Sequence, residues 1–262
     1  MDFGKIKSVA LEAAQQGAEV LMGKMGRLSE INKKGAIDLV TDADTASEKA
    51  IIATIQAAFP EHVILAEESG LSDGSSVFRW IIDPLDGTTN FAHSLGLFAV
   101  SIACARGDDI ICGVVFNPVS GELFSAVKDE GAQLNGQTIR VSDTLEVGES
   151  LLVTGFPYNV GEILEQIMTR LSRCLAASQG VRRLGSAALD LCYLACGRFE
   201  GFWEQNLKPW DTAAGLLIAR EAGARVTDFD NREFRIDMSQ LLATNGKIHH
   251  QMLDLISLED GR

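Results

Sequence analysis

Apolar residues recur every three or four positions in several stretches of the chain, which is the spacing of one helix face. Residues 5–25 predict a first amphipathic helix, and a second is expected to begin near Asp44. Residues 45–48, Thr-Ala-Ser-Glu, fit a capping box for that second helix, which runs up to Pro60. Later helices are predicted over residues 162–177, 187–196 and 211–222, with a last one near the C-terminus.

Short apolar runs predict strands between these helices. Residues 63–66 and 80–82 are continuously apolar, as in strands buried on both faces, and the polar residues 69–76 between them predict a loop. Asn135-Gly136 is a hairpin turn signal. Further strands are expected at residues 99–105, 110–116, 123–127, 151–154, 199–203, 225–227 and 242–244. Strands in runs, with helices between and after them, predict an α/β fold of mixed α+β type with layered sheets and helices.

Length and charge narrow the class of protein. The 262 residues are 46% hydrophobic, enough to bury a large core, and contain no repeat or flexible linker. We expect one unit over residues 1–262, with an N-terminal α+β half (about 1–145) and a C-terminal α/β half (about 146–262) that share one site. The net charge is −13 and the isoelectric point about 4.7. Such a surface repels phosphate backbones, so direct nucleic-acid binding is not expected, and a phosphate ligand would need divalent cations.

Cysteine usage and hydropathy indicate a compartment. The five cysteines form no C-x-x-C pair and lie in apolar surroundings, which favours free thiols in a reducing cytosol. No apolar run approaches the roughly 18 residues of a membrane span, and the N-terminus does not resemble a signal peptide. The predicted location is therefore cytoplasmic, without a membrane partner.

Acidic residues follow two predicted strands directly. Glu67 and Glu68 come after the strand at 63–66, and Asp83 and Asp86 end and follow the strand at 80–82. Ligands gather at the carboxyl ends of strands in sheets of this kind, so these acids are expected to converge. Carboxylates at such short distances repel one another, so the arrangement is stable only when cations or protons lie between them.

The residues around Asp86 suit a hard metal ion. Pro84 favours an extended backbone at Asp83, and Gly87 allows a tight turn. Thr88 and Thr89 offer hydroxyls at an expected helix N-terminus, where free amides attract an anion. Oxygen donors without nearby histidine or cysteine indicate Mg²⁺ rather than zinc.

Simpler explanations exist for each acid taken singly. The Asp-x-x-Asp-Gly turn could merely cap a helix, Asp211 is expected at the N-cap of the helix over 211–222, and Asp44 could cap the second helix. The combination of the turn with Glu67-Glu68 and the helix start at Asp211 favours a metal site.

Taken together, these segments resemble the inositol monophosphatase family of Mg²⁺-dependent, lithium-sensitive phosphatases, and its bacterial members most. The resemblance spans nearly the whole chain, and its most specific parts are the blocks Trp-Ile-Ile-Asp-Pro-Leu-Asp-Gly-Thr-Thr-Asn-Phe and Trp-Asp-Thr-Ala-Ala-Gly. The matching motifs are residues 38–44, 67–69, 80–91, 185–188 and 210–215.

The resemblance implies a fold and a set of roles. The fold would be a layered α-β-α-β-α sandwich, commonly a homodimer, and the cofactor two or three Mg²⁺ ions. Asp44 and Thr88 would orient the attacking water, while the amides of Gly87 and Thr88 would receive the phosphate. Matching metal positions are Glu67, Asp83, the Leu85 carbonyl, Thr88, Asp86 and Asp211, with Glu68 acting through water. Matching substrate positions are Asp86, Gly87, Thr88, Thr89, Arg182, Ser186, Ala187, Glu204 and Asp211.

The resemblance leaves the substrate open. A small polyol phosphate, above all inositol monophosphate, is the first expectation. The same metal centre serves fructose 1,6-bisphosphatases, histidinol phosphatases and 3′(2′),5′-bisphosphate nucleotidases. A nucleotidase should carry an aromatic or basic patch for the base, which the sequence does not reveal. A different possibility is a protein-binding accessory role in RNA processing, as in some bacterial relatives.

One departure from the family pattern is the pair Gly35-Ala36, where many members have a pair ending in proline. We predict an unusually mobile segment over residues 31–37.

Overall fold

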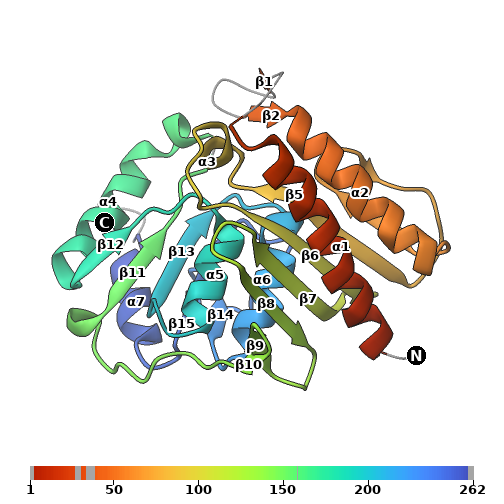
Figure 1. Ribbon diagram of the computed structural model, residues 1–262. Coiled ribbons are helices and arrows are strands. Elements are labelled where there is room, and N and C mark those ends of the chain that lie inside the picture. The colour runs from red at the N-terminus through yellow and green to blue at the C-terminus, as the bar shows by residue number, and fades with distance from the viewer. Residues whose placement is uncertain (1–2, 27–30, 34–38, 158, 259–262) are drawn as a thin grey trace.

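Helices and sheets alternate in five layers in the computed structural model, which describes residues 3–26, 31–33, 39–157 and 159–258 (Figure 1). Two N-terminal helices cover one face of a large sheet, and two further helices separate that sheet from a smaller one. A last pair of helices covers the far face of the smaller sheet. The predicted α/β class and the layered α-β-α-β-α arrangement are confirmed.

The outer helices are α1 (Phe3–Lys24) and α2 (Asp42–Ala58). Their small and branched apolar residues face each other and the sheet, and a Cβ at Gly17 of α1 would lie 2.8 Å from the Ile51 side chain. The predicted capping box at residues 45–48 is wrong. The helix begins at Asp42, and its N-cap is Thr41, four positions before Thr45; Asp44 accepts hydrogen bonds from the Thr41 amide and hydroxyl.

The large sheet has the strand order β10-β9-β8-β7-β6-β5-β3-β4. All neighbouring pairs are antiparallel except β3 and β5, whose parallel pairing aligns Ala66 with Ile82. The segment expected as a loop at 69–76 contains the short strand β4, which pairs with β3. The strands are β3 (Val63–Ala66), β4 (Gly70–Leu71), β5 (Phe78–Asp86), β6 (Ala99–Arg106), β7 (Asp109–Asn117), β8 (Glu122–Val127), β9 (Ala132–Leu134) and β10 (Gln137–Thr138).

The central layer consists of α5 (Ala187–Ala195) and α6 (Pro209–Glu221). A Cβ at Gly113 of β7 would lie 2.8 Å from the Ala214 carbonyl oxygen of α6, and one at Gly215 would lie 2.8 Å from the Leu191 side chain of α5. The small residues at the start of α6 therefore serve close packing against a strand and a helix.

The smaller sheet has the order β12-β11-β13-β15-β14, with α4 (Leu164–Ala177) and α7 (His249–Ile256) on its far face. Buried His249 lies between the hydroxyls of Thr227 and Thr244. The strands are β11 (Leu151–Thr154), β12 (Gly180–Arg182), β13 (Gly201–Gln205), β14 (Arg225–Thr227) and β15 (Gln240–Thr244). The turns η1 (Val147–Glu149) and η2 (Val160–Glu162) precede β11 and α4.

Three further predictions concern a mobile segment, the cysteines and membrane-spanning helices. The strands β1 (Ile31–Lys33) and β2 (Leu39–Thr41) pair in a separate ribbon, but residues 34–37 of the segment expected to be mobile lie outside the described residues. All five cysteines are free thiols. Within the described ranges, no helix has the length and hydropathy that crossing a bilayer would require.

Candidate active site

Two carboxylates lie side by side because β3 and β5 are parallel. The Glu67 amide, just past the end of β3, donates to the Ile82 carbonyl at 3.1 Å. The next residue on β5 is Asp83, so the two acids follow neighbouring strands in the same direction. The register shift between Asp83 and Asp86 then turns the chain towards the site.

The turn after β5 is held by its own polar groups. Asp83 Oδ1 accepts a hydrogen bond from the Leu85 amide at 2.9 Å, which fixes the carboxylate against the backbone. Gly87 has φ of +97° and is the N-cap of α3 (Thr88–Ala92). A Cβ at Gly87 would lie 2.9 Å from the Leu97 carbonyl oxygen, so both the conformation and the space require glycine.

Thr88 and Asp44 come together, as the resemblance implies. The Thr88 hydroxyl lies 3.1 Å from Asp44 Oδ1 and 3.1 Å from the Leu85 carbonyl oxygen, either of which can accept its single proton. Asp44 Oδ2 is already engaged by Thr41. The α2 start and the α3 start are therefore joined through one buried carboxylate and one hydroxyl.

The helices α5 and α6 supply the opposite wall. Asp86 Oδ2 accepts hydrogen bonds from the Ser186 hydroxyl at 2.6 Å and from the Ala188 amide at 2.8 Å. Asp211 was expected at the N-cap of its helix, but Lys208 is the N-cap, and Asp211 Oδ2 accepts from the Lys208 amide at 2.7 Å. The helix begins earlier than expected because Pro209 occupies its first turn.

These groups line one pocket of about 290 Å³, which we call the catalytic pocket. Residues from both halves of the chain contribute to it. Of the residues expected from the sequence, the pocket is lined by Glu67, Asp83, Leu85, Asp86, Gly87, Thr88, Thr89, Ser186, Ala187, Glu204 and Asp211.

Three expected residues do not line the catalytic pocket. Asp44 is buried behind Thr88, and the Glu68 amide donates to Glu48 Oε2 at 2.9 Å beside the pocket. Arg182 is exposed at the end of β12, and its guanidinium contacts the Val181 carbonyl. The neighbouring Arg183 lines the pocket, because successive residues of an extended chain point to opposite sides.

Arg183 and Asp190 are among the lining residues that the sequence analysis did not propose for the site. Arg183 lies over the Phe156 ring, 5.7 Å from its centroid, which gives the pocket a basic and aromatic side. Asp190 is buried on α5, and within the described part of the chain neither of its carboxylate oxygens has a hydrogen-bond partner. The available signal was its position one helical turn after Ser186, which places both on one face.

Crowding of the acids shifts their protonation. Burial raises the pKa of Asp83 well above its usual value, and the charges of Glu67 and Asp86 raise it further. Burial and the charge of Asp86 likewise raise the pKa of Asp211. Burial raises the pKa of Asp86 to about 6, although the Ser186 hydrogen bond opposes it. The cluster is therefore poorly tolerated as a set of bare anions.

Burial raises the pKa on the α5 side of the pocket as well. Glu204 has a pKa raised to about 8 by burial and by the charges of Asp211 and Asp86. The pKa of Asp190 is raised well above its usual value by burial and by the neighbouring Glu204 and Asp86 charges. These two carboxyl groups are therefore able to donate hydrogen bonds near neutral pH.

The donor set fits a hard divalent cation. In both Asp83 and Asp211, one carboxylate oxygen accepts a hydrogen bond from a backbone amide. This hydrogen bond fixes the orientation of the carboxylate, and therefore the direction of its second oxygen. Carboxylates, a carbonyl and a hydroxyl are the ligands that Mg²⁺ prefers. Over the described residues, no three His, Cys, Asp or Glu side chains already form a closed metal cage.

Comparison with known proteins agrees with this fold and site. The profile described as "Inositol monophosphatase family" matches residues 3–257, and the chain belongs to this family of phosphoric monoester hydrolases. A protein of Synechocystis sp. named Inositol-1-monophosphatase is 45% identical over 93% of this chain and 86% of its own length.

Other relatives carry a different name on the same fold. A Pseudomonas aeruginosa protein named Nus factor SuhB is 40% identical over 95% of this chain and 94% of its own length. The solved structure of inositol monophosphatase from Anabaena has a TM-score of 0.89 and 40% identity, and the match covers 98% of this chain and 96% of that chain. The chain is therefore an enzyme that hydrolyses phosphate monoesters.

Proposed function

We propose that the protein hydrolyses the phosphate monoester of a small polyol, with inositol monophosphate as its preferred substrate and Mg²⁺ as its cofactor. The observation that carries the proposal is the convergence of Glu67, Asp83, Asp86 and Asp211 on one small pocket next to the start of α3. Residues 1–262 would act as a single catalytic unit, since both halves line that pocket.

The proposed ligands divide into two sets that share Asp83. Glu67, Asp83, the Leu85 carbonyl and Thr88 would hold one ion. Asp83, Asp86 and Asp211 would hold a second, and Glu67 with Glu68 a weaker third. When bound, such ions neutralise the phosphate charge and lower the pKa of the attacking water. Lithium inhibition is expected from the family resemblance.

The chain's own residues would position the water and the phosphate. Asp44 accepts hydrogen bonds from Thr41 and Thr88, so the Thr88 hydroxyl is held where it can orient a water molecule. The free amides at the first turn of α3 attract an anion, and the turn at Gly87 lets a phosphate approach the backbone. Positioning and charge neutralisation supply most of the rate gain in phosphoryl transfer.

The substrate alcohol would lie against the α5 side. Ser186, Ala187 and Glu204 line this wall, and Glu204 can accept or donate a hydrogen bond to a hydroxyl group. Asp190 lies beside them, and its carboxylate oxygens have no hydrogen-bond partner among the described residues. A cavity of about 290 Å³ lined by such groups favours one sugar-sized ring over a nucleotide. Arg183 stacked on Phe156 is the feature that keeps nucleotidase activity as an alternative.

A substrate panel tests the assignment. Phosphate release would be measured for inositol 1-phosphate, fructose 1,6-bisphosphate, histidinol phosphate and adenosine 3′,5′-bisphosphate, each with Mg²⁺ and after chelation. We expect the highest kcat/KM for inositol 1-phosphate and no turnover without the ion. Highest turnover of another substrate would overturn the inositol assignment, and full activity after chelation would overturn the metal proposal.

A second candidate function is a protein-binding accessory role in RNA processing. It is supported by the relatives named Nus factor SuhB, at 40% identity. The net charge of −13 favours a protein partner over direct contact with RNA. A pull-down with Asp83→Asn discriminates the two roles: a partner retained by this variant supports the accessory role, whereas loss of hydrolysis with no partner captured leaves the enzyme alone. A homodimer and a cytoplasmic location remain predictions, which gel filtration with light scattering and cell fractionation would check.

A further inference from the structure

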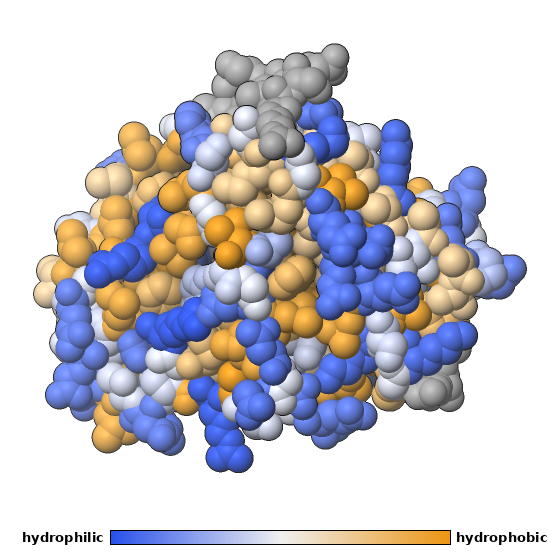
Figure 2. All heavy atoms as spheres, in the orientation of Figure 1, coloured by the Kyte–Doolittle hydropathy of each residue, from blue (hydrophilic) through white to orange (hydrophobic). Residues whose placement is uncertain are grey.

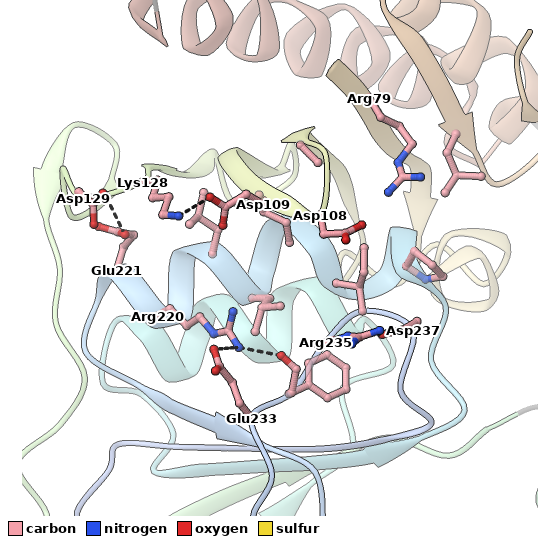
Figure 3. Close-up of a pocket in the computed structure, with 18 residues that line it drawn as sticks. Arg79, Asp108, Asp109, Lys128, Asp129, Arg220, Glu221, Glu233, Arg235 and Asp237 are labelled. Atoms are coloured by element: carbon pink, nitrogen blue, oxygen red, sulfur yellow. Dashed lines mark hydrogen bonds and ion pairs between the residues drawn. The ribbon is translucent and has the colours of Figure 1, made fainter. Parts of the chain in front are cut away.

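A second cavity, larger than the catalytic pocket, lies where the C-terminal half of α6 faces the large sheet. Its volume is about 650 Å³, and we call it the rear cavity. Its walls come from the start of β5, the β6–β7 and β8–β9 turns, the C-terminal half of α6 and the loop around Phe234 (Figure 3). Pro209 lines the rear cavity and Asp211 the catalytic pocket, so α6 runs between two separate spaces.

Most charges of the rear cavity are paired within the protein. Lys128 forms an ion pair with Asp109 at 2.5 Å, Arg220 with Glu233 at 3.4 Å, and Arg235 with Asp237 at 2.5 Å. Glu221 accepts hydrogen bonds from the amides of Asp129 and Gly131, at 2.9 and 2.8 Å. These groups fix the walls and have little left to offer a ligand.

Among the described residues, three charged side chains of the lining stand outside these contacts: Arg79, Asp108 and Asp129. The Arg79 side chain extends from β5 into the cavity, and its Nε is buried without a hydrogen-bond partner in the described part of the structure. Asp108 lies at the rim, on the turn after β6, and faces the same space, and no ion pair joins it to Arg79 in the described structure (Figure 3). The terminal nitrogens of the Arg79 guanidinium, at the end of the side chain that Figure 3 shows directed into the cavity, are the donors that a ligand can reach, and a charge-assisted hydrogen bond from them to a carboxylate would be stabilising.

The charged side chains that line the rear cavity indicate which class of ligand it can bind. Six acidic and four basic side chains line the rear cavity, so a simple polyanion is repelled at the rim even though Arg79 attracts an acid group. A molecule with both charges avoids this conflict. The floor between them is apolar, with Leu216, Phe234 and Ile236. Apolar pockets of this size with a few convergent polar groups are typical of small-molecule sites.

We propose that the rear cavity binds a small zwitterion of the amino-acid class. Its carboxylate accepts hydrogen bonds from Arg79, its ammonium group donates to Asp108, and its apolar side chain packs against Leu216 and Phe234. The site is independent of the phosphatase chemistry, because it shares no lining residue with the catalytic pocket.

Titration calorimetry of the full chain with L-leucine and L-phenylalanine tests the proposal. We expect saturable binding with one site per chain for at least one of them. For L-phenylalanine, the matched probes are 3-phenylpropanoate, which lacks the ammonium group, and phenethylamine, which lacks the carboxylate. Each should bind at least about tenfold more weakly, since each loses one charge-assisted contact.

Two variants locate the site. Arg79→Met and Asp108→Asn should each weaken amino-acid binding at least about tenfold, whereas Arg106→Met, an exposed residue at the end of β6 outside the lining, should not. If Arg79→Met does not fold, the exposed Asp108→Asn decides the question. The proposal is overturned if neither amino acid binds, if 3-phenylpropanoate binds as tightly as L-phenylalanine, or if inositol 1-phosphate with Mg²⁺ displaces the bound amino acid.

Discussion

The catalytic pocket and the rear cavity are both rich in acidic side chains, but the environments of these side chains are opposite in the two cavities. In the rear cavity, acids such as Asp109 and Glu233 are exposed and paired with basic side chains. In the catalytic pocket, Asp83 and Asp86 are buried and Asp211 is half-buried, and the charge of Asp86 raises the pKa of the other two. A count of acids would not separate the two cavities, but burial and pairing do. The catalytic pocket is the one in which acids are buried together without basic partners among the described residues, so it is the one that calls for divalent ions.

The largest expected effect is the loss of a shared metal ligand. Asp83→Asn should lower kcat/KM for inositol 1-phosphate at least about 10²-fold, because both proposed ions use this carboxylate. The matched change in the rear cavity, Asp109→Asn, should leave kcat/KM within about twofold, because this exposed ion pair is far weaker. Similar losses in both variants would contradict the distinction between the two cavities.

The second prediction concerns metal-free protein and pH. Asp86, with a pKa of about 6, and Glu204, with a pKa of about 8, hold protons in the folded state that the unfolded chain has already released. The folded state therefore binds more protons, and the free energy of unfolding should fall as pH rises from about 4 towards 8. Chemical denaturation of chelated protein at several pH values measures this slope.

Magnesium should oppose that slope, since it binds the ionised carboxylates. At 100 times its Kd, Mg²⁺ should raise the free energy of unfolding by about 2.7 kcal/mol at pH 8, and clearly less at pH 5. Asp83→Asn should flatten both dependences. An Mg²⁺ effect of equal size at both pH values would argue against an ionisation-dependent site.

The third prediction compares two glycines with positive φ. Gly87→Ala in the catalytic turn should cost about 3 kcal/mol of stability, because the strained backbone is combined with a contact to the Leu97 carbonyl oxygen. Gly107→Ala, on the turn beside the rear cavity, has open space around its Cβ and should cost only about 1 kcal/mol. Thermal unfolding of both variants checks the difference, and equal costs would show that the close approach at Gly87 is unimportant.

The smallest effect is expected from single polar contacts. Ser186→Ala removes the hydroxyl that donates to Asp86 and caps α5 by accepting from the Leu189 amide, which should cost about 1 kcal/mol. It should also shift the acidic limb of the pH–rate profile upward, since Asp86 loses a hydrogen bond that lowers its pKa. Lys128→Met at the rear cavity should change neither stability nor rate measurably. An unchanged pH profile for Ser186→Ala would contradict the role given to its hydroxyl.

Much of the fold could be predicted from local patterns. The strands at 63–66, 151–154 and 225–227 appear with the expected bounds, because continuous apolar runs between turn residues have few alternatives. Helix starts were less accurate. Thr41 and Lys208 are the N-caps where Asp44 and Asp211 had been considered, because an acid at the third helical position can also accept the N-cap amide.

Only those parts of the site that lie in contiguous sequence motifs could be predicted. Glu67 and Asp83 were assigned to one volume because strand ends in parallel pairs meet. Arg183 and Asp190 were missed, because whether a residue faces a pocket depends on how α5 and β12 pack against β5. The choice of Arg182 over Arg183 reflects the same limit, since a one-residue step on an extended chain reverses the direction of the side chain.

The sequence by itself determined the order of most of the longer helices and strands and the oxygen chemistry of the acids at strand ends, because both follow from short-range spacing and residue type. Only the tertiary structure decided which acids are buried together and which are paired with cations. Asp86 accepts a hydrogen bond from Ser186, a hundred positions away in the chain, and Arg79 and Asp108 line the same cavity. Such meetings depend on the packing of whole layers, which no local pattern encodes.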